Sequence, residues 1–364
     1  MKIGLVIYGS LDIMSGGYLY DRKLVESLRQ RGDQVEVISL PQRNYAAYLL
    51  DNLSFHLPHG FDLIIEDELN HPSLLSANAR EHPCPVIGLV HNLHSLEPRA
   101  AWQNNFLRVI ERRYLNSVDG FIFNSETTRI AVQKLVGNKK PFVIANPPTD
   151  RFGLCLDADQ VRLRADEPGP LHLLFLGNVI PIKGLHVLLD AVLRQPSAFR
   201  LDVVGSLAVD TQYVREMGHF VKAHGLSSSV RFHGILEGEP LIEQLKCAQV
   251  MVMPSSYEGF GMAYLEGMGF GLPPIATTSG AAPEFIRDGE NGYLIPPEDS
   301  SVLAERLARL SGDRKLLEQL SINALKRYQQ QPSWEQTVDR IRGYLDVIGS
   351  EWQSRVPVSL RGAP

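Results

Sequence analysis

The chain has 364 residues, of which 44% are hydrophobic, and a formal net charge of −5. This length exceeds the usual size of a single-core domain, so we expect two domains of about 170 residues each. The negative charge gives no general attraction to nucleic acid, and the sequence carries no RNA- or DNA-binding motif, so nucleic acid is excluded as an expected partner.

The first half alternates apolar strands with helical stretches. Residues 2–8 (KIGLVIY) form a continuous apolar strand, and a helical stretch follows the glycine pair Gly16-Gly17. Further strands are predicted at residues 35–40, 63–65, 86–90, 121–123 and 143–144. This alternation indicates a parallel sheet with helices on both faces.

A charged stretch at residues 157–170 precedes a second series of strands, and we predict the hinge between two domains there. The strands of the second series are predicted at residues 171–176, 201–204, 230–232, 250–253, 275–276 and 293–295. The expected fold class is α/β, with two Rossmann-like, doubly wound parallel-sheet domains at residues 1–165 and 166–332 that face each other across a cleft.

The three cysteines, Cys84, Cys155 and Cys247, lack the spacing of a metal or redox motif, which is typical of thiols in a reducing compartment. No apolar run approaches the roughly 20 residues that a membrane span needs, and the opening residues begin a strand rather than a signal peptide. We therefore expect a cytoplasmic protein, with peripheral contact at the inner face of the membrane as an open alternative.

The most informative segment is residues 251–284, in which a strand, a glycine-rich turn and a helix follow one another. Pro254 ends the strand, and Gly259 and Gly261 give the turn conformational latitude before a helix begins at Met262. The turn presents free backbone N–H groups at the positive end of a helix dipole, which suits an anion such as a diphosphate.

Two carboxylates flank this predicted anion site. Glu266 lies where it can accept hydrogen bonds from ribose hydroxyls, and Glu258 lies in the turn, where it can accept them from a sugar beyond the diphosphate. The alternative is that Glu266 is a solvated helix residue and Glu258 an ordinary turn residue. The residues of this predicted donor site are Glu258, Gly259, Phe260, Gly261, Met262 and Glu266.

Residues 254–261 (PSSYEGFG), 266–268 (EGM) and 271–277 (GLPPIAT) resemble the donor-binding signature of retaining glycosyltransferases of the GT-B fold, family 4 (glycosyl transferases group 1). The resemblance extends over nearly the whole chain, with its specific residues concentrated in the second half. It implies that the second domain binds the donor, that the acceptor enters over the first, and that a C-terminal helix at residues 333–350 crosses back to the first domain.

A second motif, residues 177–184 (GNVIPIKG), follows a strand and resembles the family's diphosphate clamp. The resemblance places Gly177 and Lys183 at the donor diphosphate, the alternative for Lys183 being a solvated lysine in the first turn of a helix. Asn178 stands where the family usually has Arg, and an amide does not replace the bidentate phosphate contacts of a guanidinium. Leaving-group stabilisation is therefore weaker or comes from another cation.

The resemblance also places residues of the first half in the site. Gly16 and Gly17 match a loop near the donor phosphates, although an ordinary strand-to-helix turn also explains them. His91 matches a histidine beside the reacting sugar, with a purely structural histidine as the alternative and His94 as a weaker neighbour. Three further positions at strand ends resemble the family's polar loop residues: Asn124, Ser125 and Asn146.

Together these residues predict a retaining hexosyltransferase that uses a UDP- or GDP-sugar and a glycan, lipid-linked or small-molecule acceptor. The catalytic residues implied are His91, Lys183 and Glu258, and closure about residues 157–170 would exclude water. No cofactor and no metal are expected, because a cation and helix amides serve the diphosphate and no Asp-x-Asp cluster appears. Arg112 and Arg113 are either contacts for an anionic acceptor or lipid phosphate, or a solvated helix face.

Two other functions fit the same cleft: a nucleotide-sugar epimerase of the same fold and a catalytically inactive nucleotide-sugar binding protein. Asn178 favours the second of these. An oxidoreductase is disfavoured, because neither strand-to-helix turn carries G-x-G-x-x-G.

Overall fold

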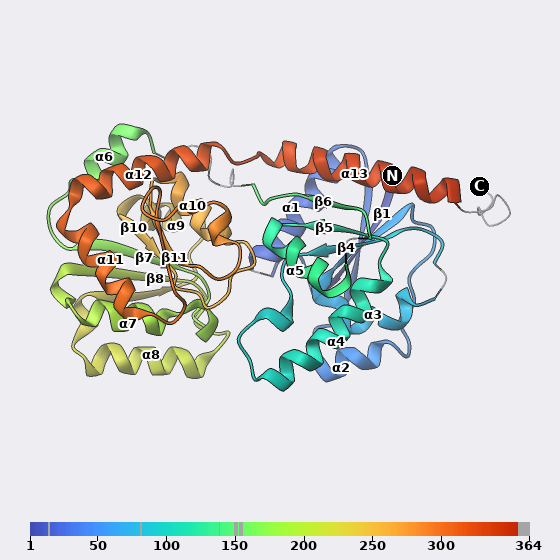
Figure 1. Cartoon of the computed structure of the whole chain (residues 1–364), viewed down its shortest axis with the longest axis horizontal. Helices are drawn as coiled ribbons and strands as arrows, with labels where there is room; N and C mark the ends of the chain where they lie inside the picture. The colour runs from blue at the N-terminus through green and yellow to red at the C-terminus, as the bar shows by residue number, and fades with distance from the viewer. Residues whose placement is uncertain (14, 81, 138, 149–151, 153–155, 356–364) are drawn as a thin grey trace. The chain divides into compact units, whose positions relative to one another are not determined.

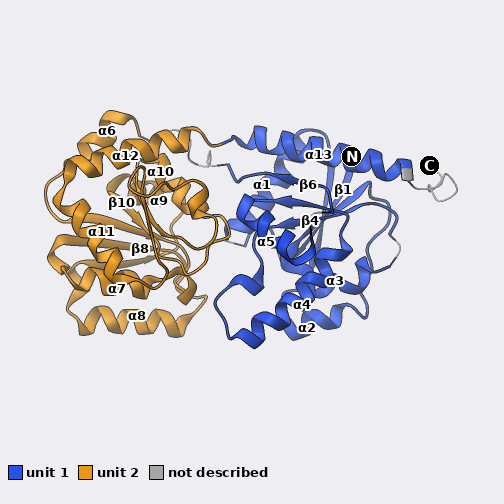
Figure 2. Cartoon of the chain, viewed as in Figure 1, with its two compact units in different colours: residues 1–148, 332–364 blue, residues 149–331 orange. Residues whose placement is uncertain are grey.

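The structure is a computed structural model that describes residues 1–13, 15–80, 82–137, 139–148, 152 and 156–355 (Figure 1). The chain divides into two compact units (Figure 2). Unit 1 comprises residues 1–148 together with residues from 332 onward, and unit 2 comprises residues 149–331. Of the cysteines, Cys155 lies outside the described residues.

In its described residues, unit 1 holds one six-stranded parallel sheet with the strand order β2-β1-β3-β4-β5-β6. Its strands are β1 (Lys2–Tyr8), β2 (Gln34–Leu40), β3 (Leu63–Asp67), β4 (Val86–Val90), β5 (Gly120–Phe123) and β6 (Phe142–Ile144). Its helices are α1 (Gly16–Gln30), α2 (Tyr45–Asp51), α3 (His71–Asn78), α4 (Ala101–Ser117), α5 (Glu126–Val136) and α13 (Trp334–Arg355).

Each face of this sheet carries its own apolar core, because successive side chains of a strand point to opposite faces. Ile3, Leu5 and Ile7 of β1 lie in the core that α1 and α13 cover, whereas Val6 and Tyr8 lie in the core on the side of α3, α4 and α5. The α13 residues in the first core are Val338, Ile341, Leu345 and Ile348. The helix α13 is therefore part of unit 1, although residues 149–331 of unit 2 separate it from the rest of that unit in the sequence.

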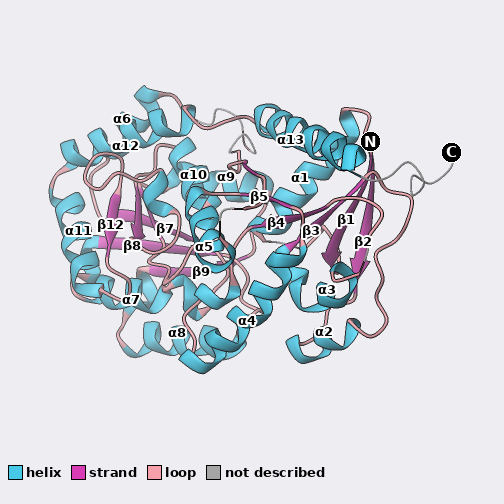
Figure 3. Cartoon of the chain, turned by 45° about the vertical axis from the view of Figure 1, so that its right-hand side comes forward, coloured by secondary structure: helices cyan, strands magenta, loops and turns pink. Residues whose placement is uncertain are grey.

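Unit 2 repeats this architecture, and its described residues form a six-stranded parallel sheet with the order β12-β11-β10-β7-β8-β9 (Figure 3). Its strands are β7 (Leu171–Leu176), β8 (Phe199–Val204), β9 (Val230–Gly234), β10 (Val250–Val252), β11 (Pro274–Thr277) and β12 (Tyr293–Ile295). Its helices are α6 (Ala158–Ala165), α7 (Leu185–Leu193), α8 (Thr211–Ala223), α9 (Gly238–Cys247), α10 (Met262–Gly269), α11 (Ser300–Gly312) and α12 (Arg314–Gln329).

The predicted fold class is confirmed, and each predicted strand is present with bounds that differ by at most two residues. Most buried strand residues of both sheets are apolar, which is typical of a parallel sheet covered by helices on both faces, and Glu66, Asp67 and Asp202 are the charged exceptions among the buried strand residues described.

The hinge predicted at residues 157–170 is wrong. A capping box at Asp157 begins α6, and α6 packs against α12 within unit 2. Arg164 is only 6% exposed, and its guanidinium donates to the carbonyl oxygen of Gly271 at 3.0 Å. A helix held by such buried contacts is not a linker, so unit 2 begins at residue 149 rather than at residue 166.

Candidate functional site

The carboxyl ends of β7 and β10 form the topological switch point of unit 2. The chain runs from β7 to β8 and β9 on one side and then returns to place β10 on the other side of β7. Ligands of open α/β sheets bind outside the carboxyl ends of the strands at such a point. The loops that follow these two strands, residues 177–184 and 253–261, are the two segments that carry the predicted donor motifs. The fold thus brings both motifs to one edge of the same sheet.

Lys183 and Glu258 form an ion pair between these two loops. Lys183 Nζ donates to Glu258 Oε2 at 2.7 Å, and the side chains are 23% and 15% exposed. An ammonium group complements a diphosphate, and an ionised carboxylate accepts hydrogen bonds from sugar hydroxyls. The pair is therefore complementary to a diphosphate and to the sugar attached to it, and each charge neutralises the other in this structure.

Backbone contacts fix the turn that holds Glu258. Ser256 N donates to Ile182 O at 2.8 Å, which joins the two loops, and Ala281 N donates to Glu258 O at 3.0 Å. Gly280 has a φ of 80°, and a Cβ atom there would lie 2.0 Å from Glu258 O, so only glycine fits. Segments from three parts of unit 2 therefore determine where Glu258 lies.

The helix α10 begins where this turn ends. Gly261 is its N-cap in the left-handed region with a φ of 95°, and no side chain of the described residues caps the helix. Tyr264 N donates to Gly261 O at 3.0 Å, and the helix dipole favours an anion beside the amides at this end of α10. Gly259 lies in the turn before it, and anion binding by this turn stays a prediction.

Two of the predicted donor-binding residues are buried. Glu266 is 7% exposed and Phe260 is 5% exposed. The Phe260 ring lies 5.5 Å from the Phe285 ring, so its side chain belongs to the core and only its backbone is left to face a donor. The alternative of a solvated Glu266 is wrong, because this carboxylate lies inside unit 2. Its role in ribose binding stays a prediction.

The loop after β7 places Gly177 beside Lys183. A Cβ atom on Gly177 would lie 3.8 Å from Lys183 Cδ, and Asn178 is half-buried at the next position. Lys183 ends a short 3-10 helix, η3 (Pro181–Lys183), and Gly184 separates it from α7. The alternative placed Lys183 in the first turn of an α-helix. Lys183 instead precedes α7.

In unit 1 the structure brings His91 and Gly17 together. A Cβ atom on Gly17, in the first turn of α1, would lie 3.4 Å from His91 Cδ2. Gly16 and Gly17 are the first residues of α1, whose N-cap Ser15 accepts a hydrogen bond from Tyr18 N at 3.3 Å. His91 Nε2 lies 2.8 Å from Asp21 Oδ1, and the two side chains are 16% and 0% exposed.

The carboxylates around His91 control its protonation. Burial lowers the pKa of His91, but the charge and hydrogen bond of Asp21, together with the charge of Asp67, more than offset this and raise the pKa above its ordinary value. Burial, helped by the charge of Asp21, raises the pKa of Asp67 to about 7. Because an ionised carboxylate only accepts, the Nε2 atom of His91 carries a proton in this hydrogen bond.

The asparagines predicted at strand ends connect those strands to one another. Asn124 Nδ2 donates to His91 O at 2.9 Å, and Asn146 Nδ2 donates to Asn124 O at 3.1 Å. Asn146 O in turn accepts from Thr337 of α13 at 3.1 Å. Ser125 is the N-cap of α5. These contacts give the two asparagines a structural role behind His91.

The other predicted positions of unit 1 lie on or beside α4. Arg112 and Arg113 are exposed on this helix, as the solvated-face alternative requires. His94 Nδ1 lies 3.6 Å from Glu97 Oε1, and burial lowers the pKa of His94. None of these three residues contacts His91 through a hydrogen bond or ion pair of the described residues.

Asp21 and Asp67 are the site residues that the sequence analysis missed. Asp21 lies among Tyr20, Leu24 and Val25 on the buried face of α1, and it is itself fully buried. An acidic residue on the apolar face of an amphipathic helix needs a partner, because a buried charge without one is costly. Its position on the apolar face of α1 was therefore the sequence signal that could have identified Asp21. Asp67 is the last residue of β3, at the switch point between β1 and β3.

Comparison with known proteins identifies unit 2. Residues 161–327 match the family described as glycosyl transferases group 1. The chain is 28% identical over 257 residues to a D-inositol 3-phosphate glycosyltransferase of Streptomyces bingchenggensis, which covers 66% of this chain and 56% of that protein. The chain thus spans about half to three fifths of the length of the curated relatives that match it first.

Solved structures share the fold of the whole chain. Sucrose-phosphate synthase from Thermosynechococcus elongatus has a TM-score of 0.81 and 21% identity, with coverage of 96% of this chain and 99% of that one. HepE from Anabaena in complex with UDP-glucose has a TM-score of 0.73 and 19% identity, with coverage of 95% and 100%. Both show the GT-B fold that the sequence predicts, and residues 161–327 of this chain are similar to the glycosyl transferases group 1 family.

Proposed function

We propose that the protein is a retaining glycosyltransferase that moves a hexose from a nucleoside diphosphate sugar to an acceptor hydroxyl. The observation that carries the proposal is the Lys183–Glu258 ion pair at 2.7 Å, which lies at the switch point of unit 2 where Gly261 begins α10 without a side-chain cap from the described residues. A cation, the N-terminal end of a helix and a carboxylate at one sheet edge are complementary to a diphosphate joined to a sugar.

These residues provide binding and charge stabilisation rather than a nucleophile. In the proposed reaction the leaving diphosphate oxygen takes the proton of the acceptor hydroxyl on the same face of the sugar, so the bond forms and breaks on one side. Lys183 and the amides of the turn stabilise the charge that develops on the diphosphate, and Glu258 orients the sugar. This mechanism assigns no metal ion to the diphosphate.

Related proteins suggest which donor to test first. HepE, which has the same fold, binds UDP-glucose in its crystal structure, and the relative from Streptomyces bingchenggensis is named for transfer to D-inositol 3-phosphate. We therefore propose a UDP-hexose as the first donor, a GDP-hexose as the second, and a polyol, glycan or lipid-linked hydroxyl as the acceptor.

A panel of nucleotide sugars, measured first by thermal stabilisation and then by turnover, tests this function. Glu258→Gln is expected to lower kcat/KM about 100-fold for the best donor, because an amide accepts fewer hydrogen bonds and lacks the charge that orients the sugar. Affinity for the free nucleoside diphosphate is expected to change by less than threefold, which corresponds to about 0.6 kcal/mol or less.

The matched control is Glu239→Gln, which changes the same side chain on the exposed surface of α9 and should leave both quantities unchanged. Product analysis with and without acceptor separates transfer from epimerisation of the donor. Full turnover by Glu258→Gln would show that this carboxylate does not contact the sugar.

Asn178 supports one rival, a protein that binds the donor without transferring it. The family usually carries Arg at this position, and here a half-buried amide follows Gly177. Donor binding with neither transfer nor slow hydrolysis in the presence of the acceptor panel would establish this rival and contradict the transferase.

We also propose that unit 1 contacts an anionic membrane surface through α4. Trp102, Phe106 and Val109 recur on one side of this helix and are 71%, 51% and 69% exposed. Arg112 and Arg113 are exposed on the same helix. Apolar and aromatic side chains beside cations are typical of helices that lie in a lipid interface. No helix of the described residues combines the length and the apolarity needed to span a bilayer.

Co-sedimentation with vesicles tests this contact. The double variant Trp102→Ser/Phe106→Ser is expected to bind vesicles of anionic and zwitterionic phospholipid at least tenfold more weakly than the parent, because it removes the apolar area that enters the interface. Leu50→Ser/Leu53→Ser removes exposed apolar side chains elsewhere in unit 1 and serves as the control. Equal binding by all three proteins, or equal binding to purely zwitterionic vesicles, contradicts the proposal.

A further inference from the structure

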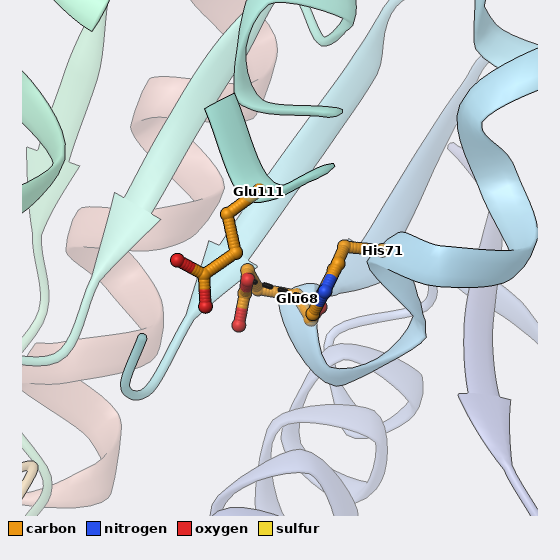
Figure 4. Close-up of side chains that lie close together, drawn as sticks. All are labelled: Glu68, His71 and Glu111. Atoms are coloured by element: carbon orange, nitrogen blue, oxygen red, sulfur yellow. Dashed lines mark hydrogen bonds and ion pairs between the residues drawn. The ribbon is translucent and has the colours of Figure 1, made fainter. Parts of the chain in front are cut away.

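Three buried side chains of unit 1 converge outside the site described above (Figure 4). Glu68 lies in η1 (Glu68–Asn70), the short 3-10 helix that follows β3, and His71 is the first residue of α3. Glu111 lies on α4, which packs against α3. One nitrogen or carboxylate oxygen from each of the three lies within 4.8 Å of the others. A histidine and two carboxylates from three elements thus face a common point.

The two carboxylates lack a cationic partner. Glu68 and Glu111 are 2% and 0% exposed, and neither forms an ion pair with a lysine or arginine of the described residues. Arg99 pairs with Glu97 instead, at 2.5 Å. Two buried carboxylates without a counter-ion are costly.

Hydrogen bonding at this point is also incomplete. His71 Nδ1 lies 2.9 Å from the carbonyl oxygen of Glu68 and 3.1 Å from Oε1 of the same residue. A neutral imidazole ring has one proton to share between its two nitrogens. The buried Glu68 Oε1 has no hydrogen-bond donor among the described residues. Glu68 Oε1 is therefore a buried acceptor in this cluster that receives no hydrogen bond from the described residues.

We propose that Glu68, His71 and Glu111 bind a divalent transition-metal ion, with Zn²⁺ as the first candidate. The 3.1 Å between His71 Nδ1 and Glu68 Oε1 is close to the edge of about 3.3 Å that a tetrahedron with metal–ligand bonds of about 2.0 Å requires. One imidazole and two carboxylates suit Zn²⁺, and two carboxylates neutralise its charge in a buried position. Glu-x-x-His is also a spacing by which helical metal sites present two ligands.

The surroundings of the three ligands fit this assignment. The hydroxyl of Tyr45 lies 2.9 Å from His71 Nε2. Because a hydroxyl both donates and accepts, it can bond either tautomer, so Nδ1 can give up its proton to become a ligand while Nε2–H donates to Tyr45. Ser95 N donates to Glu111 Oε1 at 2.9 Å and holds that carboxylate. Each carboxylate oxygen keeps a second lone pair for a metal ion.

The ion would connect η1 and α3 to α4 inside unit 1, whereas the Lys183–Glu258 pair belongs to unit 2. Its expected role is therefore stabilisation of the first unit, and the inference does not depend on the proposed glycosyl transfer. Failure to bind metal leaves the transferase proposal unchanged, and failure of the donor experiments leaves this one unchanged.

The experiment uses the full chain after treatment with chelator, titrated with Zn²⁺ in competition with a chromophoric chelator. One equivalent of Zn²⁺ is expected to bind, and to raise the melting temperature. Glu68→Gln and Glu111→Gln keep the size of the side chain, and each is expected to weaken Zn²⁺ binding at least tenfold. Co²⁺ gives a second readout, because its visible bands gain intensity when it enters a four-coordinate protein site.

His94→Gln is the matched control, since the His94 ring centroid lies 6.0 Å from that of His71 and pairs with another glutamate, Glu97. It should retain the bound equivalent. Near-UV circular dichroism of each metal-free variant verifies that the fold is kept. Absence of a stoichiometric metal ion, or equal Zn²⁺ affinity in the parent and both glutamine variants, overturns the proposal. The proposal is also overturned if Glu68→Gln melts at a higher temperature than the parent and metal changes neither melting temperature. That result would identify Glu68 as a protonated acid rather than a metal ligand.

Discussion

Replacing Lys183 with alanine is expected to reduce kcat/KM for the nucleotide sugar about 100-fold or more. The change removes the ammonium group that faces the diphosphate, and loss of one preorganised charge-stabilising group costs about 2.7–4 kcal/mol in catalysis. It also leaves the Glu258 carboxylate, 15% exposed, without the partner that lies 2.7 Å away, so a negative charge would face the incoming phosphates. The measurement is steady-state turnover, with the Kd of the nucleoside diphosphate from calorimetry.

Comparison of ligands separates a diphosphate contact from a general loss of structure. Lys183→Ala should weaken binding of the nucleoside diphosphate at least tenfold and leave binding of the nucleoside, which has no phosphates, unchanged. Lys222→Ala, on the exposed surface of α8, is the control for loss of a charge. The double variant Lys183→Ala/Glu258→Gln should recover part of the diphosphate affinity, because it removes the unpaired carboxylate. Undiminished diphosphate binding by Lys183→Ala would mean that another part of the chain holds the phosphates.

Replacing Asp21 with asparagine is expected to lower kcat/KM about 10- to 100-fold, which corresponds to the roughly 1.5–3 kcal/mol of a hydrogen bond to a charged group. The side chain keeps its size, but the carboxylate that accepts from His91 Nε2 at 2.8 Å is lost. Because the charge of Asp21 raises the pKa of His91, the limb of the pH–rate profile that reports His91 should move to lower pH. The measurement is kcat/KM as a function of pH.

Asp21 acts through His91 in this account, so it is a positioning residue. Affinity for the nucleoside diphosphate, which we propose that unit 2 binds, should be unchanged in Asp21→Asn. Glu36→Gln on the exposed face of β2 removes one negative charge from the same unit and should leave the pH profile in place. A uniform drop in rate at all pH values, with no movement of either limb, would contradict control of His91 by Asp21.

The strands were predictable from the sequence because burial on both faces leaves little choice of residue. Residues 2–8 and 171–176 are apolar runs, and the structure ends β1 and β7 at the predicted positions. The donor motifs were predictable as separate loops. Their meeting follows from the strand order, because β7 and β10 are neighbours even though the motifs are far apart in the chain.

The domain boundary was not predicted, and α6 explains the error. Charged residues at 157–170 indicated a linker, but Asp157 and Gln160 form a capping box and Arg164 buries its guanidinium against backbone carbonyls. A long side chain with a charged end can cover apolar surface, so charge alone does not show exposure. The spacing of Asp157 and Gln160 was the signal of a helix start.

The residues that the sequence left unassigned are those joined only by tertiary contacts. Asp21 and His91 are separated by 70 positions, and no local pattern shows that α1 passes beside the end of β4. Glu68 and His71 lie near each other in sequence, but Glu111 reaches them only because α4 packs on α3. Composition and spacing thus identify loops with chemistry, whereas pairing partners require the strand order and helix packing.

The place of α13 has a consequence for how the protein is made on the ribosome. The stretch 149–331 is continuous and completes unit 2, whereas unit 1 receives Val338, Ile341 and Leu345 only after that stretch has been translated. Until then α1 alone covers that face of the unit 1 sheet, and the nascent chain exposes the rest of its apolar surface to water and to chaperones. The unit translated first is thus the last to mature.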